Sequence, residues 1–189
     1  MCGIVGYTGG KMAKDVLIEG LERLEYRGYD SAGIALQDAG KLTVVHRVGK
    51  VSGLAEVVRF LDNPGTCGIG HTRWATHGAP SERNAHPHTS CNGDIAVVHN
   101  GIIENFAELR ERLEKAGHVF TSDTDTEVVA HLIEEAYEGD LRAALAAACS
   151  QIVGAYGLAV VCAQEPGRIV VTRKDSPIVL AHGDAGSYV

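Results

Sequence analysis

The chain begins Met1-Cys2-Gly3-Ile4-Val5-Gly6, a cysteine followed by a short apolar run. A small residue at position two is what removal of Met1 requires, and the new first residue would carry both a thiol and a free α-amine. Reference pKa values of about 7.7–8.0 for the amine and about 8.5 for the thiol are close, so the amine can accept the thiol proton near neutral pH. This stretch predicts a nucleophile served by its own N-terminus. The alternative is an ordinary strand residue behind a retained Met1, whose peptide bond would acylate the nitrogen.

The composition describes an ordinary globular protein that fits one domain of 189 residues. A net charge of −7 argues against a general nucleic-acid surface. No run approaches the roughly 18 apolar residues that span a bilayer, so we expect no membrane partner. The five cysteines are odd in number and contain no Cys-x-x-Cys pair, which favours a reducing cytosol and a cytoplasmic location.

Hydrophobic periodicity predicts strands near both ends of the chain and helices grouped in the middle. We expect strands over residues 3–8, 31–36, 42–47, 67–72, 94–99, 155–163, 168–172 and 178–181. Helices are expected over residues 14–24, 53–61, 105–116, 125–137 and 141–149. This grouping differs from regular strand–helix alternation and favours an α+β fold with antiparallel sheets.

A polar segment over residues 73–93 interrupts this pattern, and structureless loops of that length are usually functional. It opens with Arg73, which follows a strand and could bind a carboxylate with two parallel hydrogen bonds. The hydroxyl of Thr76 and the imidazole of His77 could add directional hydrogen bonds. The alternative is a surface arginine beside Trp74 acting as a core anchor.

Two further clusters carry weaker signals. The side-chain amide of Asn100 and the backbone N–H of Gly101 are two donors that could converge on one oxyanion, although Asn-Gly is more often a simple turn that ends a strand. The segment 122–127 is most simply the capped start of a helix. Its Asp125 carboxylate could instead hold a substrate ammonium group.

Four histidines, at positions 71, 77, 86 and 88, invite a zinc interpretation. No cysteine pair completes the set, and no His-Glu-x-x-His motif occurs in the chain. We therefore expect no metal site and no cofactor.

Taken in series, six segments are closely similar to one known family. They are Met1–Gly6, Leu24–Gly33 (LEYRGYDSAG), His71–Gly78 (HTRWATHG), Asn84–His88 (NAHPH), His99–Asn105 (HNGIIEN) and Thr124–Glu127 (TDTE). The chain resembles the class II, N-terminal-nucleophile glutamine amidotransferases, and in particular the glutaminase domain of glucosamine-6-phosphate synthase. The resemblance implies an αββα four-layer sandwich of two antiparallel sheets.

The resemblance also implies roles for the catalytic residues. Cys2 would be the nucleophile, with its own α-amine as base. Asn100 and the N–H of Gly101 would form the oxyanion hole. His86 matches a position with a structural or loop-ordering role.

For the substrate, the resemblance implies L-glutamine held at its amino-acid end. Arg73 would bind the α-carboxylate, with Thr76 and His77 nearby, and Asp125 would bind the α-ammonium group. Trp74 would belong to a flexible loop that closes over glutamine and gates ammonia transfer.

The family also implies partners beyond these residues. Residues 1–189 would be a C-terminally truncated glutaminase domain, and the missing sugar-isomerase domains would bind fructose 6-phosphate. The full-length protein would be a homodimer in amino-sugar biosynthesis. Two alternatives stay open: the glutaminase domain of another class II amidotransferase, of the amidophosphoribosyltransferase or asparagine synthetase type, and a non-catalytic glutamine-binding module.

Overall fold

Two antiparallel sheets form the centre of the protein, whose computed structural model describes residues 2–189. Met1, and with it the question of its removal, lies outside the described residues. The first sheet has the order β3–β2–β4–β1–β10–β9, with β1 (Gly3–Gly9), β2 (Ser31–Asp38), β3 (Lys41–Val48), β4 (Cys67–Arg73), β9 (Ala181–Gly183) and β10 (Gly186–Tyr188). The second has the order β5–β6–β7–β8, with β5 (His88–Thr89), β6 (Ile95–Ile103), β7 (Gly154–Cys162) and β8 (Ile169–Lys174).

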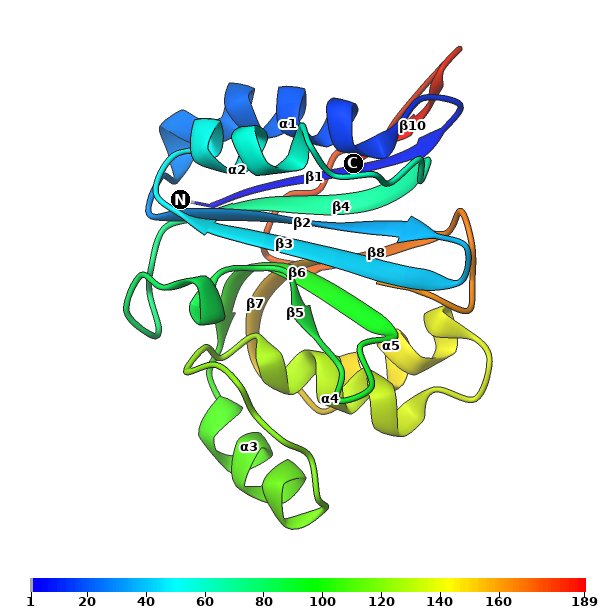
Figure 1. Ribbon diagram of the computed structural model, residues 1–189. Helices are drawn as coiled ribbons and strands as arrows, with labels where there is room; N and C mark the ends of the chain where they lie inside the picture. Colours follow the sequence, from blue (N-terminus) through cyan, green and yellow to red (C-terminus); the bar gives the residue numbers. More distant parts are fainter. Residues whose placement is uncertain (1) are drawn as a thin grey trace.

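Helices cover the outer face of each sheet, as Figure 1 shows. The first sheet carries α1 (Ala13–Leu24) and α2 (Val51–Val58), and the second carries α4 (Glu127–Ala136) and α5 (Leu141–Cys149), with α3 (Phe106–Lys115) at the periphery. Short 3-10 turns cover Glu25–Arg27 and Glu82–Asn84. The expected four-layer αββα sandwich is therefore confirmed. No helix in the described residues 2–189 has both the length and the apolar character that crossing a membrane requires.

Alternating side chains of the central strands enter two different layers of the core, because successive residues of a strand face opposite sides of the sheet. On β2, Ile34 and Leu36 pack under α1 and α2, whereas Ala35 packs between the sheets. On β7, Leu158 packs under α4 and α5, whereas Ala159 packs between the sheets. Burial on both faces explains why these strands read as continuous apolar runs.

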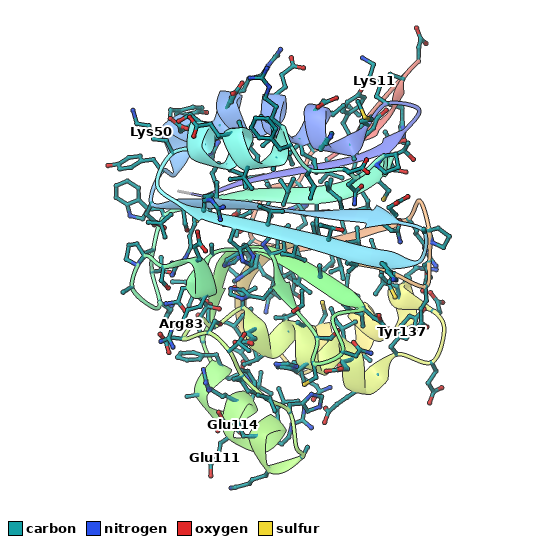
Figure 2. The ribbon with its side chains drawn as sticks, in the orientation of Figure 1. Lys11, Lys50, Arg83, Glu111, Glu114 and Tyr137 are labelled. Atoms are coloured by element: carbon teal, nitrogen blue, oxygen red, sulfur yellow. The ribbon has the colours of Figure 1, made fainter. Side chains whose placement is uncertain are left out.

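The outermost helix, α3, is mainly polar. Its buried residues are Leu109 and Leu113, and Figure 2 shows Glu111 and Glu114 at the end of the molecule farthest from the first sheet. Arg110 and Lys115 pair with glutamates one turn away on the same helix. These exposed i,i+4 pairs are solvated helix surface of low energetic value.

The structure corrects two expected strand boundaries. The strand expected to end at residue 99 continues through Asn100 and Gly101 to Ile103, paired throughout with β7. The last strand, expected over residues 178–181, is wrong apart from Ala181, where the hairpin β9–β10 begins. That hairpin joins the first sheet because β10 pairs with β1 at the opposite end of the chain, a contact that local sequence does not encode.

Candidate active site

A cavity of about 810 Å³ opens where β1 begins and β4 ends. The register pairs Gly3 with Thr72, so Cys2 and Arg73 lie side by side at neighbouring strand ends. All eight sequence-predicted residues line this cavity: Cys2, Arg73, Trp74, Thr76, His77, Asn100, Gly101 and Asp125. Residues from the two sheets and from the segment before α4 thus meet in one place.

The sulfur of Cys2 lies against the backbone of Trp74. The Trp74 N–H donates to Cys2 Sγ at 3.2 Å, and the thiol lies 3.6 Å from the Trp74 carbonyl oxygen. Burial raises the pKa of the Cys2 thiol, while the Trp74 hydrogen bond and the positive charge of Arg73 act in the opposite direction. A thiol in this setting is protonated near neutral pH, so attack by its sulfur requires a base.

Asn100 reaches the same corner from the second sheet. Its Nδ2 donates to the Cys2 carbonyl oxygen at 3.3 Å, and its Oδ1 lies 2.9 Å from His71 Nε2. The same ring nitrogen lies 3.0 Å from the His99 carbonyl oxygen. Both neighbours of this nitrogen are acceptors, so His71 donates from Nε2. Its bond to Oδ1 fixes the orientation of the Asn100 amide, with Nδ2 on the side of Cys2. Sequence reasoning missed His71, because nothing in a strand sequence shows which partner a buried ring will meet.

Gly101 follows with a φ of +145°, inside a strand rather than at its end. A Cβ built at this position would lie 2.0 Å from the Ala155 carbonyl oxygen. Only glycine can therefore occupy this position without moving β7. Because Gly101 lets the backbones of β6 and β7 lie this close, β6 stays paired with β7 past the cavity to Ile103.

That continuation positions Asp125. The Ile103 N–H donates to Asp125 Oδ2 at 2.8 Å, while Oδ1 lies 3.9 Å from His77 Nδ1. Asp125 is buried and precedes α4, which begins at Glu127 rather than at the expected residue 125. The N-cap residue, Thr126, makes no capping hydrogen bond through its side chain. Instead, the Glu127 carboxylate accepts hydrogen bonds from the backbone N–H groups of Thr121 and Ser122.

Arg73 is buried and holds the following loop in place. Its Nη2 donates to the carbonyl oxygens of His77 and Gly78, the latter at 2.9 Å. Its Nη1 has no hydrogen-bond partner among residues 2–189 and lies 3.9 Å from Asp30 Oδ1. The loop carbonyls therefore occupy Nη2, and the two-pronged contact with a carboxylate that the sequence predicts would require them to move away.

The loop after Arg73 forms the rim of the cavity. Trp74 is 47% exposed and packs edge-on against Tyr29 at 5.3 Å between ring centroids, and Thr76 is exposed. The Ala75 N–H donates to Asp30 Oδ2. Asp30 is a second residue that sequence reasoning left without a role, although it lies in one of the segments quoted for the family resemblance.

The loop is also tied to the segment that carries Asp125. Arg83, labelled in Figure 2, forms an ion pair with Asp123, and the Asp123 N–H donates to Asn84 Oδ1 at 2.9 Å. Asn84 Nδ2 donates in turn to the Ala79 carbonyl oxygen at 2.9 Å. The buried Asn84 thus connects the rim to the segment that carries Asp125.

Buried histidines form the wall behind Asn100. The rings of His71 and His86 stack with centroids 4.2 Å apart, and His86 Nδ1 accepts from the His99 N–H at 3.2 Å. Burial lowers the pKa of His71 and of His88 to about 3, so both rings are neutral. Within residues 2–189, the histidines at 71, 77, 86 and 88 do not converge as a metal-binding group.

Comparison with known proteins gives this arrangement a family. A family model described as "Glutamine amidotransferase domain" matches residues 71–184. The glutamine–fructose-6-phosphate aminotransferase (isomerizing) of Pyrococcus horikoshii is 55% identical over 191 residues, which cover 100% of this chain and 32% of that protein. The enzyme of the same name from Symbiobacterium thermophilum is 58% identical over 184 residues, which cover 97% of this chain and 30% of that protein.

A solved structure shows the same architecture. The glutamine phosphoribosylpyrophosphate (PRPP) amidotransferase from B. subtilis superposes with a TM-score of 0.82 and 27% identity, covering 100% of this chain and 41% of that one. The chain spans about a third of the length of the two curated relatives. The family resemblance inferred from the six sequence segments is confirmed. Because the family model covers more than half of the chain and these relatives align along nearly all of it, the chain belongs to the glutamine amidotransferase domain family.

Proposed function

We propose that this chain hydrolyses L-glutamine to L-glutamate and ammonia, with Cys2 as the nucleophile. The observation that carries the proposal is the convergence of a thiol, an amide donor and two opposite charges in one cavity of a glutamine amidotransferase domain. A glutamine molecule presents an α-carboxylate, an α-ammonium group and a side-chain amide. Arg73, Asp125 and Cys2 are chemically matched to these three groups in that order.

The charge pair would bind the amino-acid end of the substrate. Arg73 Nη1 is a buried donor without a hydrogen-bond partner in the described chain, which suits a carboxylate oxygen. Asp125 lines the same cavity, and its Oδ1 lies 3.9 Å from His77 Nδ1. Thr76 and His77 would complete the contacts from the loop, and Trp74 would cover the bound substrate.

The reaction would begin once Met1 has been removed. The free α-amine of Cys2 takes the thiol proton, and Sγ attacks the side-chain amide carbon of glutamine. The tetrahedral oxyanion is stabilised by Asn100 Nδ2 and the Gly101 N–H. The N-terminal ammonium then returns a proton to the leaving nitrogen, the carbon–nitrogen bond breaks, and ammonia departs. Water, deprotonated by the same amine, hydrolyses the glutamyl thioester to release glutamate and the thiol.

The ammonia acceptor is proposed from the relatives. Both quoted curated relatives are named glutamine–fructose-6-phosphate aminotransferases, and this chain aligns with about a third of their length. We propose that residues 1–189 form the glutaminase part of such an enzyme, which passes ammonia to fructose 6-phosphate bound by further domains. The full-length enzyme would be a cytoplasmic homodimer without nucleic-acid or membrane partners. Sequence identities of 55% and 58% to this enzyme favour it over a PRPP amidotransferase, to which the sequence identity is 27%.

The decisive experiment joins intact mass with a glutamate-release assay on the same preparation. We expect the mass of the chain without Met1 and glutamate formed at the rate of ammonia. A Cys2→Ala variant should bind glutamine without hydrolysing it. A preparation whose N-terminus is permanently acylated should be inactive, and undiminished activity after acylation would refute the N-terminal base.

A further inference from the structure

Four potential metal ligands meet around α4, and none of them lines the cavity just described. Cys91 lies in the turn between β5 and β6, His118 follows α3, and His131 and Glu134 lie on α4. Each contributes one ligand atom, and these four atoms lie within 4.8 Å of one another. The family function described above uses none of these residues.

The spacing of the ligand atoms suits a small metal ion at their centre. Cys91 Sγ lies 3.5 Å from His118 Nδ1 and 3.6 Å from His131 Nδ1, and Glu134 Oε2 lies 3.1 and 3.3 Å from the same two nitrogens. Zinc bonds of about 2.3 Å to sulfur and about 2.0–2.1 Å to nitrogen or oxygen give tetrahedral edges of about 3.3–3.6 Å. Four of the six distances between the ligand atoms lie at or near these values. The other two, from Nδ1 to Nδ1 and from Sγ to Oε2, are within 4.8 Å.

Hydrogen bonding alone accounts poorly for the crowding around one oxygen. Glu134 Oε2 lies 3.0 Å from the Cys91 N–H, in addition to its contacts with the two imidazole nitrogens. Three donors would thus compete for the lone pairs of a single carboxylate oxygen. A cation bound between Oε2, the imidazoles and the thiolate removes this competition, because each Nδ1 then directs a lone pair at the metal.

The second ring nitrogen of each histidine faces a carboxylate, as the imidazole ligands of metals usually do. His118 Nε2 lies 3.6 Å from Glu135 Oε1, and His131 Nε2 lies 3.8 Å from Glu127 Oε1. His131 is buried, and its Nε2 has no hydrogen-bond partner among residues 2–189. Such carboxylates keep the proton on Nε2 and leave Nδ1 free to bind the metal.

We propose that Cys91, His118, His131 and Glu134 bind a divalent transition-metal ion, zinc in the first instance, as a closed structural site. One sulfur, two imidazole nitrogens and one carboxylate oxygen form a four-ligand set typical of zinc, with no position left for a substrate. The ion would fasten the β5–β6 turn and the segment after α3 to α4. The proposal departs from the sequence-based expectation of no metal, which considered the loop histidines at 71, 77, 86 and 88.

The test is a Co²⁺ and Zn²⁺ titration of the chain after dialysis against a chelator. All proteins carry Cys2→Ala, so that the thiol of residue 2 cannot bind Co²⁺ and contribute a thiolate band. The parent should bind about one Co²⁺ with tetrahedral visible bands and a sulfur-to-metal charge-transfer band, and Zn²⁺ should displace it. Cys91→Ser should lose the charge-transfer band and weaken binding at least about tenfold, and His118→Gln should weaken binding similarly.

Matched controls separate this site from unspecific binding. Cys149→Ser and His182→Gln change a cysteine and a histidine outside the group and should leave the spectrum and stoichiometry unchanged. Zinc should raise the melting temperature of the parent and of both controls but not that of Cys91→Ser or His118→Gln. Absence of the charge-transfer band in the parent overturns the proposal whatever the variants do. An unchanged band in Cys91→Ser overturns it as well.

Discussion

His71 Nε2 and Asn100 Oδ1 lie 2.9 Å apart, and this bond joins a strand of the first sheet to a strand of the second directly behind Cys2. It orients the amide so that Nδ2 faces the Cys2 carbonyl oxygen at 3.3 Å. The oxyanion donor proposed for the site is therefore held by a neutral, buried histidine.

Replacing Asn100 by alanine should lower kcat by about two to three orders of magnitude, with little change in KM. The loss of one oxyanion donor typically costs about 2.7–4 kcal/mol of transition-state stabilisation, and the ground-state amide gains little from that donor. Steady-state glutamate release measures both constants. A fall in kcat of less than tenfold would remove Asn100 from this role.

His71 should act through Asn100, as a positioning residue. His71→Leu removes the Nε2 donor and should lower kcat with little effect on KM, whereas His71→Gln offers an N–H near the same place and should retain more activity. In an Asn100→Ala background the two His71 variants should differ little from each other. A double-mutant cycle that gives additive losses would contradict the coupling.

The role of Arg73 can be tested with a substrate that lacks the α-carboxylate. Arg73→Lys should raise KM for glutamine, because a lysine ammonium cannot reproduce the donor geometry of a guanidinium. The variant should also lose the preference for glutamine over 4-aminobutanamide, which lacks the α-carboxylate. Arg47→Lys, whose partner is the exposed Glu82, is the matched surface control. An unchanged KM in Arg73→Lys would refute a carboxylate contact.

Asp125 is tested from the other end of the substrate. Asp125→Asn keeps an oxygen for the Ile103 N–H, so the local fold should persist while the negative charge is lost. KM for glutamine should rise, and the preference for glutamine over glutaramic acid, which lacks the α-amine, should disappear. Asp123→Asn removes an exposed charge nearby and serves as the control. If Asp125→Asn and Asp123→Asn prefer glutamine over glutaramic acid to the same extent, Asp125 does not bind the ammonium group.

Stability should fall as the pH drops below about 6.5. Burial lowers the pKa of His71 and of His88 from 6.5 to about 3 in the folded chain, so between these values the unfolded chain binds more protons. Each such histidine destabilises the fold by up to about 1.4 kcal/mol per pH unit as the pH decreases through this interval. Urea unfolding between pH 7 and 5 measures the slope. His88→Gln should flatten it, whereas the exposed His182→Gln should not.

Periodicity predicted the antiparallel sheets and the grouped helices, whereas the four layers were implied by the family resemblance. The eight residues named from the sequence line one cavity, and their roles in it stay predictions. Sequence reasoning misjudged Asn100-Gly101 as the end of a strand, since the same dipeptide serves as a turn and as a point of close backbone approach. Residues 178–180 looked like a strand by hydrophobicity, yet Val179 is 77% exposed. The roles of His71 and Asp30 depend on partners distant in the sequence, which periodicity cannot reveal.

The hydrogen bond from the Trp74 N–H to Cys2 Sγ comes from the main chain, so substitution of the indole side chain leaves this donor in place. The pKa of the Cys2 thiol therefore depends on the position of the Trp74 backbone and not on the identity of the side chain at residue 74. Removal of this hydrogen bond would raise the pKa of the Cys2 thiol further, so changes of loop length or backbone would alter its reactivity more than replacement of the indole.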